Sequence, residues 1–130
     1  MAFERFSNFN SRSGKSYANI TRNYAINFSS GFGEENGIAK FKYAVLYFDK
    51  KDCAIGVKFT NNATEEAKFV AGKKQASSGV TVIARSFFKK YDIDLEKYDK
   101  IRYAPYKTKL RDIGIDEPGI MYVIKLEERG

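Results

Sequence analysis

The sequence contains no histidine and only one cysteine, and each shortage removes a class of chemistry. Histidine is the commonest general base and the commonest metal ligand in proteins. Metal-dependent or triad catalysis would therefore depend on carboxylates, lysines or tyrosines alone. The single cysteine, Cys53, excludes an internal disulfide bond and a cysteine metal cluster. It lies in an apolar stretch, which favours a buried structural thiol.

Long apolar runs are also missing from the chain. No stretch approaches the roughly 20 residues that a membrane helix needs. The N-terminal stretch, MAFERFSNFNSRSGKSY, lacks the apolar region of a signal peptide. The sequence therefore predicts a cytoplasmic protein with no membrane partner.

The acidic residues do not form a two-carboxylate site. Glu34-Glu35 and Glu65-Glu66 are neighbours in sequence, so on a strand the two side chains of each pair would face opposite ways. On a helix the side chains of each pair would diverge by about 100°. The many lysines and tyrosines do not cluster with any base. We therefore expect no enzyme activity, no cofactor and no metal site.

The residues that are abundant are basic and aromatic. The chain has 130 residues, of which 43% are apolar, including 11 Phe and 9 Tyr, so it can bury the core of one domain. It carries 23 Lys and Arg against 16 Asp and Glu, a net charge of +7. This balance favours a polyanionic partner, either nucleic acid or an acidic protein surface.

Two stretches, residues 24–48 and 79–103, share a strand, short helix, strand layout at a spacing of 55 positions. At that spacing the identical pairs are Phe32 and Phe87, Ile38 and Ile93, Lys42 and Lys97, and Tyr43 and Tyr98. The pattern predicts two related halves, at about 17–60 and 67–126. It predicts one domain over 17–130, preceded by a flexible N-terminal arm over 1–16.

Hydrophobic alternation and turn residues predict the individual elements. We expect strands over 17–28, 42–48, 53–60, 67–71, 80–83, 99–104 and 120–126, and helices after Ser29 or Ser30 and over 84–91. A turn near Arg22 and Asn23 would split the first strand, and Gly37 should end the first helix. Residues 106–118 read as a charged connection. The fold class predicted is α+β, mainly antiparallel β-sheet or a small barrel with two short helices.

Each half resembles the swapped-hairpin unit of the AbrB/SpoVT-like DNA-binding family. The resemblance lies in Ala25–Ile38 with the hairpin to Phe59, and in Val80–Ile93 with the strands to Leu126. The chain lacks the family's usual glycine-arginine before the second strand and the proline that opens the helix. The resemblance implies that two units interleave into a small barrel, here within one chain, and that the protein binds DNA.

A second resemblance is to the single-strand-binding transcriptional coactivator and Whirly folds. A basic, twisted antiparallel sheet with few helices is similar to these proteins, which pair as homodimers and lay single strands across their sheets. The two resemblances leave open whether the DNA is double- or single-stranded and whether the protein forms a homodimer.

Lysine and arginine contacts to phosphates supply affinity that does not depend on sequence. Several basic residues gather at equivalent places in the two halves, and we expect these to contact nucleic acid: Arg12, Lys15, Arg22, Lys73, Lys74 and Arg85. Tyr17 and Tyr24 are candidates for stacking on bases. The sequence thus predicts a DNA-binding transcriptional or regulatory factor. The alternative is a protein-interaction module, such as an antitoxin-like regulator or an inhibitor that binds an acidic protein surface.

Overall fold

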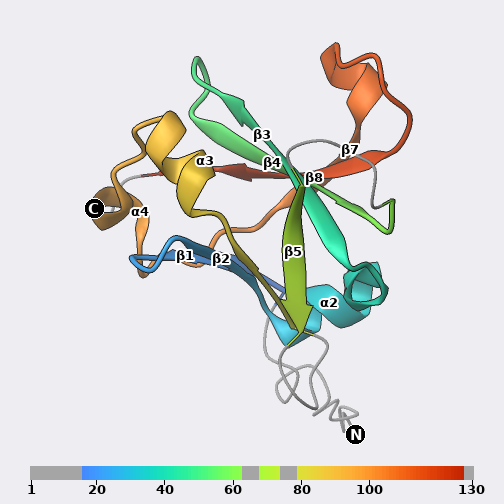
Figure 1. The fold of residues 1–130 in the computed structure, drawn as a ribbon, viewed down its shortest axis with the longest axis horizontal. Coiled ribbons are helices and arrows are strands. Elements are labelled where there is room, and N and C mark those ends of the chain that lie inside the picture. Colours follow the sequence, from blue (N-terminus) through green and yellow to red (C-terminus); the bar gives the residue numbers. More distant parts are fainter. Residues whose placement is uncertain (1–15, 63–67, 74–78, 128–130) are drawn as a thin grey trace, which may run out of the picture.

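The computed structural model of the protein describes residues 16–62, 68–73 and 79–127, which build one curved antiparallel sheet (Figure 1). Its strand order is β1-β2-β6-β5-β3-β4-β8-β7. The strands are β1 (Ala18–Thr21), β2 (Ala25–Phe28), β3 (Tyr43–Asp49), β4 (Ala54–Thr60), β5 (Lys68–Lys73), β6 (Val80–Ile83), β7 (Tyr106–Lys109) and β8 (Ile120–Lys125). The helices are α2 (Ser30–Asn36), α3 (Arg85–Lys90), α4 (Leu95–Tyr98) and two 3₁₀ turns, η1 (Ile38–Lys40) and η2 (Leu110–Ile113).

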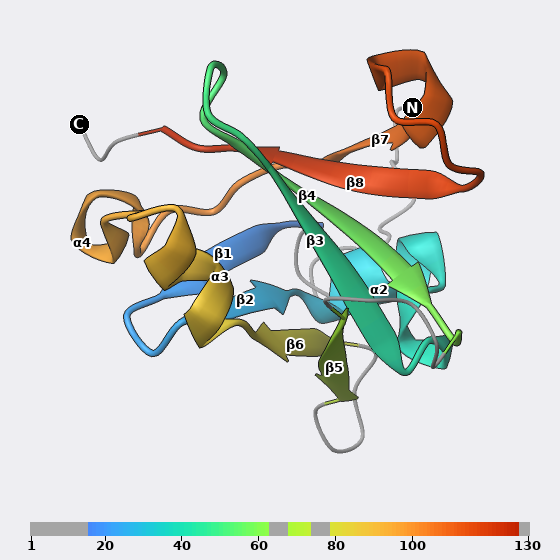
Figure 2. The same ribbon diagram turned by 45° about the horizontal axis from the view of Figure 1, so that its top comes forward.

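The sheet folds over on itself as a half-barrel. Strands β1, β2, β6 and β5 form one part and β3, β4, β8 and β7 the other, and Figure 2 shows the two parts facing each other. The parts join where β5 pairs with β3, with Val70 opposite Tyr43. On the far side, Tyr103 and Ala18 exchange two backbone hydrogen bonds of 2.7 and 2.9 Å. This bridge ties β1 to the segment that leads into β7.

Aromatic side chains fill the space between the two parts. Phe28 is fully buried, and its ring centroid lies 5.2 Å from that of Phe32 and 5.3 Å from that of Phe59. The Phe32 ring meets that of Tyr122 at 5.2 Å. Since aromatic residues dominate the energy of a core, this cluster joins α2 to both parts of the sheet.

The local signals for α2 are confirmed. The Ser29 hydroxyl accepts a hydrogen bond from the Phe32 backbone N–H at 3.2 Å, which caps the helix start. Gly37 ends the helix in the left-handed conformation, with φ of 63°. The first predicted strand is indeed split into β1 and β2 by a turn at Arg22 and Asn23. The predicted β3–β4 hairpin is also confirmed.

The predicted strand over 99–104 is wrong. Only Tyr103 makes a strand-like bridge, and Lys100 has φ of 62°, which is incompatible with extended backbone. The preceding residues form α4 instead, because the Asp94 side chain accepts a hydrogen bond from the Glu96 N–H at 3.1 Å and caps it. The second half therefore lacks the strand that should follow its helix, and the prediction of two related halves is not confirmed.

The prediction for the C-terminal region needs two further corrections. Residues 106–118, expected to be a connection, contain β7 and η2. Strand β8 was expected to bury one face, yet Met121, Tyr122, Val123 and Ile124 are all buried. The chain after β7 folds back and places Leu110 against Met121 and Val123 as a second, smaller core. None of the helices in the described part of the chain has the length and apolar character that crossing a membrane requires.

Candidate nucleic-acid interface

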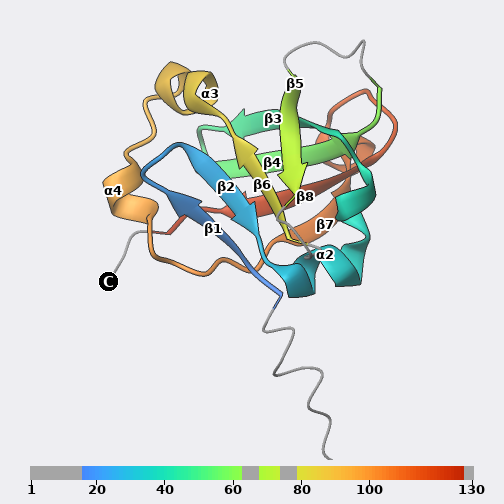
Figure 3. The ribbon, with the colours of Figure 1, turned by 60° about the horizontal axis from the view of Figure 1, so that its bottom comes forward.

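Strands β1, β2, β6 and β5 lie side by side (Figure 3), and the outer face of the first three carries a row of polar residues. Asn19 lies opposite Asn27, Asn27 opposite Thr81, and Thr81 opposite Gly72. The Thr81 hydroxyl donates a hydrogen bond of 2.7 Å to Oδ1 of Asn27. Amide and hydroxyl groups of this kind can exchange hydrogen bonds with the edges of nucleic-acid bases.

Two exposed apolar residues lie beside this polar row. Val70 is 70% exposed and Ile83 is 64% exposed. Since Ala71 lies opposite Val82, the same register puts Val70 and Ile83 side by side at the end of the β5–β6 pairing. Such high exposure means that no described element covers this part of the sheet. An apolar pair on an uncovered sheet is a natural contact for a flat ligand or a partner.

A tyrosine flanked by two cations, Tyr24, lies at the same end of the β2–β6 pairing, with its ring 6.5 Å from that of the buried Phe88. The Arg85 guanidinium carbon lies 5.4 Å from the Tyr24 ring centroid, and the Lys89 ammonium nitrogen lies 5.9 Å from it. The position of Tyr24 is fixed by its backbone, since its carbonyl accepts a hydrogen bond of 2.8 Å from the Ala84 N–H. Arg85 and Lys89 are exposed. The arrangement offers positive charge beside the sheet on a rigid support.

A second cation–tyrosine pair lies at the opposite end of β1. The Arg102 guanidinium carbon is 4.7 Å from the Tyr17 ring centroid. Tyr17 is held in place by a hydrogen bond from its N–H to the Ser29 hydroxyl at 3.0 Å and by one from the Ser29 N–H to its carbonyl at 2.9 Å. A cation–tyrosine contact therefore lies near each end of β1.

Arg22, which was also predicted to contact nucleic acid, is paired with carboxylates in the structure. Its Nε lies 2.8 Å from Oδ2 of Asp99, and its Nη1 lies 4.0 Å from Oε1 of Glu96. The Asp99 side chain is only 5% exposed, so the Arg22 guanidinium is committed to a largely buried carboxylate. Arg22 is thus a weaker candidate for a phosphate contact than Arg85.

The other predicted contacts fall into two groups. Arg85 opens α3 and Lys73 ends β5 opposite Val80, so both border the same four-stranded part of the sheet. Arg12, Lys15 and Lys74 lie outside the described residues. Sequence reasoning missed two cations, Lys89 and Arg102. Lys89 lies four residues after Arg85 on one helix, which could have indicated it, whereas no local signal connects Arg102 with Tyr17.

Two tyrosines have perturbed acidity, and both belong to the core. Burial raises the pKa of Tyr122 and of Tyr103 above the ordinary value of 10.0. Within the described ranges, no cluster of three or more Cys, Asp or Glu side chains could hold a metal ion.

Comparison with protein-family models, curated proteins and solved structures found no match for this chain. The resemblances to the AbrB/SpoVT-like and single-strand-binding folds therefore stay predictions from sequence.

Proposed function

We propose that the protein binds single-stranded nucleic acid across the outer face of β1-β2-β6-β5. The observation that carries this proposal is the Tyr24 ring flanked by Arg85 and Lys89 beside an uncovered sheet face. Cations of this kind neutralise phosphates, and the sheet beside them supplies polar and apolar groups for bases. The net charge of +7 agrees with a polyanionic ligand.

The dimensions of the face suit a short run of unpaired nucleotides. Four strands about 4.8 Å apart span about 14 Å, and four residues along a strand extend about 13 Å. The polar row through Asn27 and Thr81 would contact base edges, and Val70 and Ile83 would pack against base faces. The phosphates would then follow the border formed by Arg85 and Lys89.

The short helices favour a single strand over a duplex. Helices α2, α3 and α4 have 7, 6 and 4 residues, and the first two bury Phe32, Phe87 and Phe88 in the core. Major-groove reading needs a helix or ribbon that projects into the groove, and no described helix is placed to do so. A transcriptional or regulatory role, a relationship between the two halves and the AbrB/SpoVT-like resemblance stay predictions that accompany this proposal.

Fluorescence anisotropy with labelled oligothymidine and a hairpin duplex of equal length tests the proposal. At about 50 mM and about 200 mM salt, we expect tighter binding to the single strand and a steep loss with salt. The variant Arg85→Gln/Lys89→Gln should bind more weakly, with a log–log salt slope reduced by roughly 1.4, since each phosphate contact on a single strand contributes about 0.7.

The matched control is Lys107→Gln/Lys109→Gln, which removes the same charge from β7 at the other end of the strand order. This control should bind like the unmodified protein. Equal losses of nucleic-acid affinity in both variants would show that binding depends only on overall charge. This result would overturn the assignment of binding to this face. Absence of binding by the unmodified protein at low salt would overturn the function itself.

A protein-interaction module is the second candidate, and the exposed pair Val70 and Ile83 favours it specifically. In this case the same face would dock on an acidic protein surface. A complex that forms with one protein, resists salt and is lost in Val70→Ser/Ile83→Ser, without any nucleic-acid binding, would support this candidate instead.

A further inference from the structure

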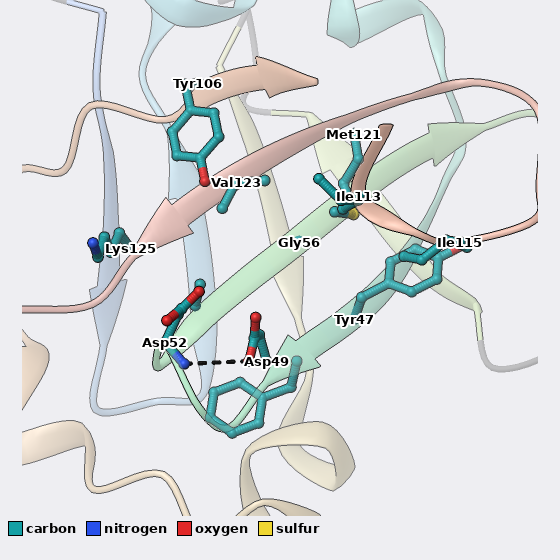
Figure 4. A pocket seen from close by; sticks show the side chains of 12 residues that line it. Tyr47, Asp49, Asp52, Gly56, Tyr106, Ile113, Ile115, Met121, Val123 and Lys125 are labelled. Atoms are coloured by element: carbon teal, nitrogen blue, oxygen red, sulfur yellow. Dashed lines mark hydrogen bonds between the residues drawn. The ribbon is translucent and has the colours of Figure 1, made fainter. Parts of the chain in front are cut away.

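The other part of the sheet has a cavity on its outer face, away from the proposed nucleic-acid interface (Figure 4). It has a volume of about 410 Å³, within the range of small-molecule sites. Its floor lies over β4 and β8 and is formed by Ala54, Gly56, Met121 and Val123. Strand β4 contributes only small residues, Ala54 and Gly56, to this floor. A Cβ atom on Gly56 would clash with Sδ of Met121, because the methionine side chain fills the space above this glycine.

The wall of the cavity is fixed by contacts within the protein. Leu110 is fully buried and anchors the chain that leaves β7. Further along, the Tyr47 hydroxyl donates a hydrogen bond of 2.9 Å to Oε2 of Glu117, and the Lys58 ammonium lies 3.6 Å from the same oxygen. These contacts hold Ile115 of the intervening turn over the cavity. The cavity is therefore formed before any ligand arrives, which lowers the cost of binding.

Apolar groups at the mouth of the cavity are exposed to solvent. Tyr106 is 54% exposed and Ile113 is 48% exposed, and both line the cavity. Covering them would remove apolar surface from water and so favour binding of an apolar body. The edge strand β7 also carries Lys107 and Lys109, a composition that opposes the addition of another strand. A ligand inside the cavity is therefore favoured over a peptide that extends the sheet.

One end of the cavity is acidic although the protein is basic. Asp49 and Asp52 lie side by side there, with Lys125 beyond them (Figure 4). Asp49 Oδ1 accepts hydrogen bonds from the N–H groups of Lys51 and Asp52 at 3.0 and 3.2 Å, which fixes this carboxylate. Lys50 and Lys51, which stand between the two aspartates in the turn, do not line the cavity, so an ammonium group placed there would meet two carboxylates and one lysine.

We propose that this cavity binds a small primary amine carried on an aromatic or branched aliphatic body. The apolar body would lie over Ala54 and the Met121 side chain that covers Gly56, between Tyr106 and Ile113. The ammonium group would lie at the acidic end and donate hydrogen bonds to Asp49 and Asp52. Such charge-assisted hydrogen bonds are stronger than neutral ones and would select an amine over an uncharged analogue.

Isothermal titration of the full chain with phenethylamine tests this site, with phenylpropionate as the ligand of the same body and opposite charge. We expect phenethylamine to bind and phenylpropionate to bind at least about tenfold more weakly. Asp52→Asn should weaken phenethylamine binding about tenfold. The matched control, Asp92→Asn, removes an exposed carboxylate from the loop after α3 and should leave the affinity unchanged.

Two further variants test the apolar part of the cavity. Ala54→Leu fills the floor and should abolish binding. Ile113→Ser removes an exposed part of the wall without affecting the main core, so it should weaken binding in a folded protein. Failure of phenethylamine to bind, equal affinity for phenylpropionate, or equal effects of Asp52→Asn and Asp92→Asn would each overturn the proposal.

Discussion

Replacing Arg22 by alanine should reduce the stability of the fold much more than it reduces nucleic-acid binding. The Asp99 side chain is 5% exposed, and the Arg22 Nε lies 2.8 Å from its Oδ2. Breaking a fully buried ion pair costs about 3–5 kcal/mol. The Arg22 side chain is 55% exposed, so solvent screens the interaction and the expected loss falls to about 1–2 kcal/mol. Because the two residues are 77 positions apart, the loss reports on tertiary structure.

Urea denaturation followed by far-ultraviolet circular dichroism measures this effect. The midpoint should fall at an unchanged m-value, and the melting temperature should fall by about 3–10 °C. Arg22→Lys keeps the charge and should recover part of the loss. A cycle with Asp99→Asn should give a coupling energy of about 1 kcal/mol between the two side chains. If Arg22→Ala leaves the unfolding free energy unchanged and weakens oligothymidine binding as much as Arg85→Gln/Lys89→Gln, the structural role assigned to Arg22 is refuted.

Three further predictions concern the core, the helix end and pH. Phe28→Ala should cost about 3–5 kcal/mol in urea denaturation, because the fully buried ring contacts those of Phe32 and Phe59. Gly37→Ala should cost about 1 kcal/mol in the same assay, because its φ of 63° is unfavourable for a residue with a Cβ. Burial raises the pKa of Tyr122 and Tyr103 in the folded state, so the unfolded chain ionises first. Their contribution to the free energy of unfolding is therefore complete below a pH of about 10. It is lost above that pH, and Tyr122→Phe should make the fall in stability with rising pH shallower.

The sequence correctly predicted the helices and strands that are determined by residues close together in the chain. The Ser29 cap and Gly37 define α2, and the alternating residues that flank the turn at 49–52 define the β3–β4 hairpin. The failure over 99–104 has a long-range cause. There the chain turns at Lys100 and presents Asp99 to Arg22, a residue of the β1–β2 turn. An apolar and tyrosine-bearing pattern cannot reveal such a contact.

The C-terminal region shows a second limit of the pattern. Alternation predicted a strand with one buried face at β8, but the residues of the other parity, Met121 and Val123, are buried too. Both residues are buried because Leu110 packs against them. Leu110 follows a strand rich in lysine, and the sequence of this region is therefore typical of a connection. The floor of the nearby cavity includes small residues of β4, and a small residue in a strand does not by itself indicate a cavity. The sequence alone therefore could not predict the cavity over β4 and β8.

Four of the five exposed large apolar residues of the described chain lie on the two proposed surfaces, and the fifth, Ile120, lies on neither. Val70 and Ile83 lie on the β5–β6 face, whereas Tyr106 and Ile113 line the cavity over β4 and β8. The two parts of the sheet place these surfaces on opposite outer faces, with the aromatic core between them. We therefore expect the two activities to be separable. Arg85→Gln/Lys89→Gln should leave phenethylamine titration unchanged, and Asp52→Asn should leave oligothymidine anisotropy unchanged. Coupled losses in folded variants would contradict this division, because they would require one shared surface.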